Sequence, residues 1–232
     1  MIRRSRQNLW ARRQSERSGN TRMLIVCEGR ETEANYFHGL WDEIMAKSGS
    51  RKGFALTIKR GRGGSRRDIA QFAVDQKNGS RDEYDEYHCI MDVEHHLHWA
   101  ALPGALRLLK QNGFTVHLSN PSFEVWFLAH FRRTSAIFAD ADAVITALNP
   151  LWKAGGNGKY EKSDRAHFSK LRNRLVSAIA TARAVRTKSH RPANATTENC
   201  NSSTDVYRFV ERLVSPKKPP KKRKPKKRHK GK

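Results

Sequence analysis

Hydrophobic and polar positions along the first 131 residues alternate between two periods. Short apolar or alternating runs, typical of strands, are followed by stretches with apolar residues three or four positions apart, typical of helices. The predicted strands are 23–27, 54–59, 87–91 and 114–118. The predicted helices are 31–47, 66–77, 102–112 and 123–131. This alternation predicts an α/β fold with a mainly parallel sheet and helices on both faces.

Beyond residue 131 the periodicity is weaker and mostly helical. The expected helices are 140–148, 166–186 and 205–214. Two stretches without periodicity separate them, the glycine-rich basic loop 153–162 and the polar loop 189–203. We therefore predict a helical C-terminal extension to the α/β core.

The positive charge of the chain is concentrated at its two ends. Of the net charge of +24, residues 216–232 supply 11 Lys/Arg with no acid, and residues 1–22 supply seven Arg and one Glu. The remaining +7 belongs to residues 23–215. Strongly basic ends repel themselves and suit a polyanion, because each neutralised phosphate releases counterions. Nucleic acid is the favoured partner, and a merely solubilising tail is the alternative.

A chain of 232 residues is long enough for one domain with a real core. We place a basic flexible arm at 1–21, one domain at 22–214 and a Lys/Arg/Pro-rich disordered tail at 215–232. Within the domain, the α/β core covers about 22–131 and the helical extension 132–214.

The three cysteines, Cys27, Cys89 and Cys200, do not have the spacing of a metal site. Cys27 and Cys89 lie in apolar runs, where a free cysteine behaves as a small hydrophobic residue. This usage favours a reducing cytoplasm. No apolar run approaches the length of a membrane span, and no signal peptide is recognisable, so we expect a cytoplasmic protein without a membrane partner.

Acidic residues follow two of the predicted strands. Glu28 comes directly after the first strand, and Asp92 and Glu94 follow the third. In open α/β sheets, ligands bind at the carboxyl ends of strands, and residues two apart face one side of an extended strand. Three converging carboxylates would raise one another's pKa unless a hard divalent cation lay between them. The alternative is that Glu28 only caps its turn and the other two are ordinary strand-end acids.

The order of strand, Glu-Gly, helix and later acidic pair resembles the TOPRIM fold of topoisomerases, primases and overcoming-lysogenization-defect (OLD) nucleases. More narrowly, four segments together resemble the RloB family: LIVCEGRETEANYFHGL, MDVEHH, SNPSFEVWFLAHF and SSTDVYRFVERL. The resemblance covers roughly residues 22–214 and leaves out both arms. That family is associated with bacterial phage defence and restriction loci, and its members are often encoded near an ATPase.

The resemblance implies roles for the acids. Glu28 matches the TOPRIM glutamate, a metal ligand or general acid/base, and Asp92 and Glu94 match the acidic pair of metal ligands. Glu33 resembles a further metal-ligating acid, but it lies five residues after Glu28 instead of four. On a helix this changes its direction by about 100°, which favours a helix-surface acid instead.

A Ser-x-Glu element, Ser122 and Glu124, resembles the one that supplies a further ligand in OLD nucleases. Glu124 is then a metal ligand and Ser122 lies along the nucleic acid; the alternative is that Glu124 only complements its helix N-terminus. Lys159 or Lys162 would supply the catalytic cation that stabilises a pentacoordinate phosphate, and the sequence does not distinguish them.

A glycine and arginine loop precedes the second helix. Its arginines are predicted to contact the phosphates of nucleic acid: Arg60, Arg62, Arg66 and Arg67. The loop does not have the ending of a nucleotide-binding P-loop, and a solvated loop is the alternative. His95, His96 and His98 are interpreted as polar loop residues near the phosphate path; zinc ligation is the less favoured interpretation, because consecutive ligands rarely converge.

Together these features predict a TOPRIM-like, Mg²⁺- or Mn²⁺-dependent nuclease that cleaves DNA or RNA in anti-phage defence, by abortive infection among other routes. Nucleic acid and an ATPase are the expected partners, and assembly into a homo-oligomer stays open. The alternative is a non-catalytic nucleic-acid- or partner-binding subunit of an ATPase-containing defence complex.

Overall fold

The computed structural model describes residues 21–48, 54–80, 83–94, 101–187, 197 and 200–214. The predictions made for the two arms, for His95, His96 and His98, and for most of the 189–203 loop lie outside these residues.

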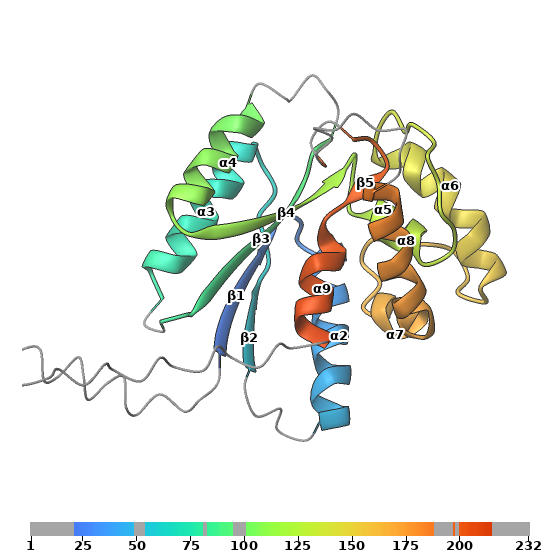
Figure 1. Ribbon diagram of the computed structural model, residues 1–232, viewed down its shortest axis with the longest axis horizontal. Coiled ribbons are helices and arrows are strands. Elements are labelled where there is room, and N and C mark those ends of the chain that lie inside the picture. The colour runs from blue at the N-terminus through green and yellow to red at the C-terminus, as the bar shows by residue number, and fades with distance from the viewer. Residues whose placement is uncertain are drawn as a thin grey trace, which may run out of the picture.

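The core of the fold is a five-stranded sheet with the order β2-β1-β3-β4-β5 (Figure 1). Four strands are parallel: β1 (Thr21–Cys27), β2 (Phe54–Lys59), β3 (Glu86–Asp92) and β4 (Phe114–Asn120). The short β5 (Ser203–Thr204) pairs antiparallel with β4. The predicted α/β class with a mainly parallel sheet is confirmed. None of the helices described is long and apolar enough to cross a membrane.

Helices cover both faces of the sheet, as predicted (Figure 1). α3 (Arg66–Asn78) and α4 (Leu102–Gln111) pack on one face, and α2 (Thr32–Ser48) and α9 (Val206–Val214) on the other. Alternate residues of β1 serve the two faces, because successive side chains of a strand point in opposite directions. The β1 residues on the α2 side are Met23, Ile25 and Cys27, and those on the α3 side are Leu24 and Val26.

Two residues that the sequence marks as helix boundaries, Ser65 and Gly113, have the expected conformations. The Ser65 hydroxyl caps α3 and forms a capping box with Asp68, whose side chain accepts from the Ser65 backbone N–H at 3.1 Å. Gly113, directly after α4, has a φ of +79°, which glycine adopts without steric cost.

The C-terminal region is helical, as predicted, but its boundaries differ. α5 (Glu124–Ala129) is followed by α6 (Ala141–Ala154), which continues through Pro150 instead of ending at residue 148. The continuation buries Trp152 completely, one turn after the buried Leu148, and this burial offsets the cost of proline within a helix. The loop predicted at 153–162 therefore begins after α6.

The single helix predicted at 166–186 is wrong. The chain forms α7 (His167–Leu171), a 3₁₀ turn (Arg172–Arg174) and α8 (Leu175–Thr187). α7 packs against α2, whereas α8 packs against α5 and α9. The break redirects the chain, because the two halves bury their apolar residues against different helices.

The last described segment returns to the sheet, which the helical periodicity did not indicate. The Ser119 and Thr204 hydroxyls of β4 and β5 lie 2.8 Å apart, and α9 places Phe209 4.5 Å from the His88 ring centroid. β5 has only two residues, too few to show a period. The C-terminal region is thus part of the same core and not a separate layer.

A buried histidine on β4 makes the stability of the fold sensitive to acid. His117 is 4% exposed, and burial lowers its pKa from 6.5 to about 3. The folded state disfavours the charged imidazole. The stability that neutral His117 contributes to the fold is therefore fully present above pH 6.5 and is lost as pH falls toward 3. We expect the free-energy difference between wild type and His117→Gln to shrink by about 1.4 kcal/mol per pH unit below 6.5 in urea titrations. A pH-independent difference would contradict this assignment.

Candidate active site

An open cleft of about 330 Å³ lies at the carboxyl ends of β1 and β3. Among the residues that the structure describes, 13 line it, and of these only Arg30 and Lys162 are basic. Six are acids: Glu28, Glu31, Glu33, Asp92, Glu94 and Glu124. An acidic cleft in a chain of net charge +24 is unexpected on composition alone. A phosphate would be repelled here unless cations first neutralised the carboxylates.

Strand pairing brings Glu28 and Asp92 together. β1 and β3 are parallel neighbours in which Cys27 pairs with Ile90, so their ends reach the same edge of the sheet. The Asp92 backbone N–H donates to Glu28 Oε2 at 2.8 Å. Asp92 Oδ1 is buried and has no hydrogen-bond partner among the described residues. A buried, unpaired carboxylate oxygen costs stability, which makes it a candidate ligand atom.

Burial and mutual repulsion raise the pKa values of these acids. Burial raises the pKa of Glu28 from 4.5 to about 7, although the Asp92 N–H bond and Arg66 act in the opposite direction. Burial is also the main reason why the pKa of Asp92 lies well above its usual value, and Glu28, Glu33 and Glu124 raise it further. At neutral pH these clustered carboxyl groups are therefore more stable when they bind protons or a cation than when they are ionised and unpaired.

Glu33 faces the cleft, so the expectation that it lies on the helix surface is wrong. α2 begins at Thr32, which puts Glu33 in its first turn, where it is 5% exposed. Its Oε1 accepts from the Gly29 backbone N–H at 3.1 Å. A Cβ at Gly29 would lie 2.4 Å from Glu33 Oε2, so the glycine makes room for this carboxylate.

Glu94 reaches the cleft by a different route from the expected extended strand. β3 ends at Asp92, and Glu94 has a φ of +53° with its N–H bonded to the Pro121 carbonyl at 2.8 Å. The Glu94 side chain is 52% exposed and pairs with Arg66 Nη2 at 3.0 Å. It therefore lies at the rim of the cleft.

The Arg66 side chain is buried and holds the end of β3, which carries Asp92, instead of facing solvent. It is 3% exposed, and its guanidinium donates to the backbone carbonyls of Asp92 and Val93. The phosphate contact predicted for Arg66 does not fit this placement, because its Nη atoms are already bonded inside the protein. The prediction grouped Arg66 with the arginines of the preceding loop, whereas Arg66 is the first residue of α3 and its guanidinium is buried against the end of β3.

The two candidate lysines separate clearly. Lys162 Nζ lies 3.9 Å from Glu124 Oε1 and lines the cleft. Lys159 is 81% exposed, pairs with Glu161 at 3.7 Å and does not line the cleft. The geometry thus favours Lys162 as the cation that could meet a phosphate.

Glu124 has a second neighbour that the sequence did not suggest. It is 3% exposed at the start of α5, and its Oε1 accepts from the Tyr160 hydroxyl at 2.9 Å. Burial raises the pKa of Tyr160, so its hydroxyl remains a donor. One aromatic residue in an otherwise polar, glycine-rich loop was the only signal that could have identified it.

The remaining predicted contacts to nucleic acid lie around this cleft. Arg62 and Arg67 are exposed, and the Arg62 guanidinium stacks 5.2 Å from the Phe72 ring centroid. Arg60 donates to the Arg30 carbonyl at 2.7 Å and to Asn35. Ser122, in contrast, is 2% exposed at the turn before α5, which leaves it no access to a bound strand.

Comparison with known families identifies the chain. The family model described as RloB-like protein matches residues 23–213. The chain belongs to the RloB-like family. No curated protein and no solved structure shows significant similarity to it. The matched region of this RloB-like chain contains every residue of the acidic cleft. The relation to TOPRIM and OLD-type nucleases stays a prediction.

The acidic cleft of this RloB-like protein fits a hard divalent cation. In the part of the chain that the structure describes, no three His, Cys, Asp or Glu side chains lie close enough together to hold a metal by themselves. Mg²⁺ does not require such a cage, since it keeps several waters and takes one or two carboxylates plus substrate phosphates. The unpaired Asp92 Oδ1 and the raised pKa of Glu28 are what such an ion would relieve.

Gly61 in the RloB-like chain packs directly against the backbone at the end of β1. A Cβ at Gly61 would lie 1.9 Å from the Glu28 carbonyl oxygen, so Gly61→Ala must push the β1 end away. We expect it to lower the free energy of unfolding by about 1–3 kcal/mol. Gly104→Ala is the matched control, because a Cβ there meets nothing within 4 Å and the helix gains about 0.5–1 kcal/mol. Urea unfolding of both variants tests this, and equal effects would contradict it.

Proposed function

We propose that this RloB-like protein is a metal-dependent nuclease that hydrolyses phosphodiester bonds of DNA or RNA in bacterial anti-phage defence. The observation that carries the proposal is the pair of partly buried acids, Glu28 and Asp92, at the adjacent ends of parallel strands, with Asp92 Oδ1 unpaired among the described residues. The defence setting is supported by the family association alone.

Glu28 and Asp92 would hold Mg²⁺ or Mn²⁺ together with waters and substrate phosphates, and Glu33, Glu94 and Glu124 line the same cleft. When bound, such an ion polarises a phosphate oxygen and makes a water molecule a stronger nucleophile. The charge of the acids explains why the phosphate needs the ion before it can enter the cleft.

The protein's own groups orient the reaction. The Asp92 N–H holds the Glu28 carboxylate, and Arg66 holds the end of β3 through two backbone carbonyls. Lys162 has a side chain that is 55% exposed, so its ammonium group can reach a phosphate oxygen from the rim of the cleft. There it would stabilise the negative charge that develops on the phosphate.

The test is cleavage of plasmid DNA and total tRNA by the full chain with Mg²⁺, Mn²⁺ or EDTA. We expect cleavage that requires the metal and falls at least about 100-fold in Glu28→Gln, since that variant keeps the shape but removes a ligand charge. Asp42→Asn, which changes an exposed acid on α2, is the matched control. Equal cleavage by wild type and Glu28→Gln would refute the assignment of Glu28.

The charge distribution supports a second candidate, a non-catalytic nucleic-acid- or partner-binding subunit of an ATPase-containing complex. Residues 1–22 and 216–232 carry +17 of the net +24, and binding through them needs no metal. Gel-shift assays in EDTA distinguish the two candidates. Tight, salt-sensitive binding without cleavage under any metal condition, including in the presence of a partner ATPase, would favour the subunit.

A further inference from the structure

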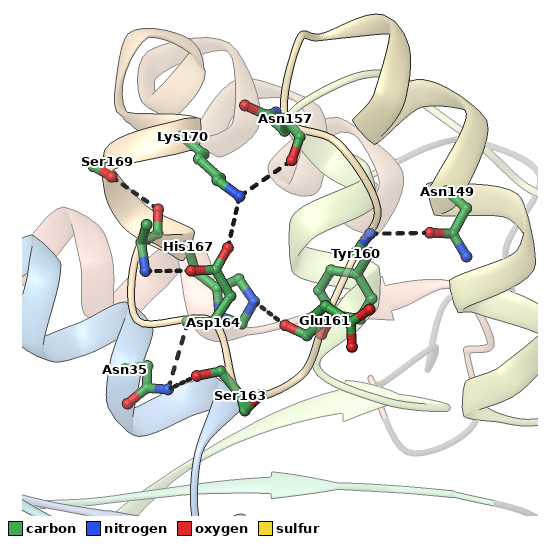
Figure 2. Close-up of polar contacts among 11 residues, drawn as sticks. Asn35, Asn149, Asn157, Tyr160, Glu161, Ser163, Asp164, His167, Ser169 and Lys170 are labelled. Atoms are coloured by element: carbon green, nitrogen blue, oxygen red, sulfur yellow. Dashed lines mark hydrogen bonds and ion pairs between the residues drawn. The ribbon is translucent and has the colours of Figure 1, made fainter.

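Residues 155–166, which we call the strap, lead from α6 to α7 and border the acidic cleft through Lys162. Figure 2 shows how polar contacts hold the strap on its C-terminal side. Lys170 Nζ donates to Asp164 Oδ2 at 2.7 Å and to the Asn157 carbonyl at 3.1 Å, and His167 Nε2 lies 2.9 Å from the Glu161 carbonyl. These hydrogen bonds fix the backbone path of the strap.

The strap is also tied to the first turn of α2, which lines the same cleft. The Thr32 hydroxyl donates to the Lys162 carbonyl at 3.1 Å. Asn35 Nδ2 donates to the Ser163 carbonyl at 3.1 Å (Figure 2). Glu33 lies between these two anchors in the sequence and lines the cleft. The contacts join the part of the chain that supplies Glu33 to the part that supplies Lys162.

Within the strap, Tyr160 is held rigidly. Its ring is 4% exposed, stacks on His167 at 5.5 Å and meets Trp152 edge-on at 5.4 Å between centroids. Its backbone N–H donates to Asn149 Oδ1 at 3.2 Å (Figure 2). A phenol packed in this way has little freedom to move its hydroxyl, so the hydroxyl is a fixed point next to the cleft.

That hydroxyl donates to Glu124 Oε1, the same oxygen that lies 3.9 Å from Lys162 Nζ. Among the described residues, the contacts of Tyr160 and Lys162 with Glu124 are both made to Oε1. The other carboxylate oxygen, Oε2, is left for a ligand in the cleft that Glu124 lines. With an apolar neighbour in place of Tyr160, this buried carboxylate would lose a hydrogen-bond donor that fixes its orientation. The strap thus places the Tyr160 hydroxyl, a neutral donor, and the Lys162 ammonium group next to Glu124 of α5.

We infer that Tyr160 is a positioning residue for the acidic cleft, which fixes the Glu124 carboxylate so that Oε2 would remain available to a cation held there. The inference rests on the proposed function and adds to it a residue that contacts no substrate. Hydrogen-bond partners of metal ligands set ligand orientation, and their loss typically lowers metal affinity 10- to 100-fold.

Mn²⁺ binding tests the inference without reference to activity. Titration of the full chain with Mn²⁺, followed by the loss of the free-ion paramagnetic resonance signal, gives the Kd for wild type, Tyr160→Phe, Glu124→Gln and the double variant. We expect Tyr160→Phe to raise the Kd about 10-fold. In the Glu124→Gln background the same change should have no further effect, because Tyr160 acts through Glu124. Tyr84→Phe, on the opposite face of the sheet, should keep the wild-type Kd.

The outcomes separate the two proposals. Metal-dependent cleavage and tight Mn²⁺ binding by wild type, together with an unchanged Kd in Tyr160→Phe or additive effects in the double variant, would overturn only the role of Tyr160. The absence of a cooperative melting transition in Tyr160→Phe would also overturn it, since the hydroxyl would then serve the fold. Wild type that neither binds Mn²⁺ nor cleaves would overturn the proposed function itself.

Discussion

Glu28→Gln is expected to stabilise the protein by about 3 kcal/mol at pH 8 in metal-free buffer while it removes metal-dependent cleavage. The reason is that burial raises the pKa of Glu28 from 4.5 to about 7, so at pH 8 the fold contains a carboxylate in its less favoured ionised form. Glutamine keeps an oxygen that can accept from the Asp92 N–H but carries no charge.

The sign of this effect depends on pH in a defined way. Below pH 4.5 the side chain is protonated in both states and the substitution changes little. Between pH 4.5 and about 7 the unfolded state ionises first, so the stability of wild type falls relative to the variant. Above pH 7 the difference is constant.

Urea unfolding from pH 4 to 8 in EDTA measures the difference directly. Added Mg²⁺ should raise the stability of wild type and leave Glu28→Gln nearly unchanged, because a ligand that binds only the folded state stabilises it. Asp42→Asn, at an exposed position of α2, provides the control for charge removal. A Glu28→Gln variant less stable than wild type at pH 8 would show that the carboxylate is favourably bound within the fold.

Arg66→Met is expected to lower the free energy of unfolding by about 3 kcal/mol, and Arg67→Met to change it by less than about 0.5 kcal/mol. The two arginines are consecutive on α3, but Arg66 is 3% exposed and Arg67 is exposed. Methionine fills similar volume without a donor, so the carbonyls of Asp92 and Val93 lose their charge-assisted hydrogen bonds. The partner Glu94 is half exposed, so the ion pair itself adds little.

Thermal and urea unfolding of the Arg66→Met and Arg67→Met variants provide the measurement. Arg66→Met should also weaken Mn²⁺ binding, because the end of β3 carries Asp92. Equal stabilities of the two variants would mean that Arg66 does not stabilise the end of β3. The phosphate contact first predicted for Arg66 would then again be the better interpretation.

Much of the fold followed from local pattern. The strand bounds 54–59 agree with β2, and the apolar runs of β1 and β3 indicated strands covered on both sides. The convergence of Glu28 and Asp92 could also be predicted, because the ends of neighbouring parallel strands meet at one edge. The break between α7 and α8 could not, since both halves have acceptable helical periodicity.

The side chains that complete the cleft depend on contacts between distant segments. Glu33 turns inward because the Gly29 N–H accommodates its carboxylate, and Arg66 is buried because the end of β3 lies over it. Tyr160 meets Glu124 across 36 positions, and Thr32 meets Lys162 across 130. No spacing rule relates such pairs.

The sequence by itself determined the α/β class, the order of strands and helices up to residue 131, and the acids at the ends of β1 and β3, because periodicity and strand ends are local properties of the chain. Only the tertiary structure decided which lysine borders the cleft, how Glu33 and Glu94 face it, and that Tyr160 holds Glu124. The physical reason is that burial and hydrogen bonding at the cleft are set by packing among β1, β3, α2, α5 and the strap, which are far apart in the sequence.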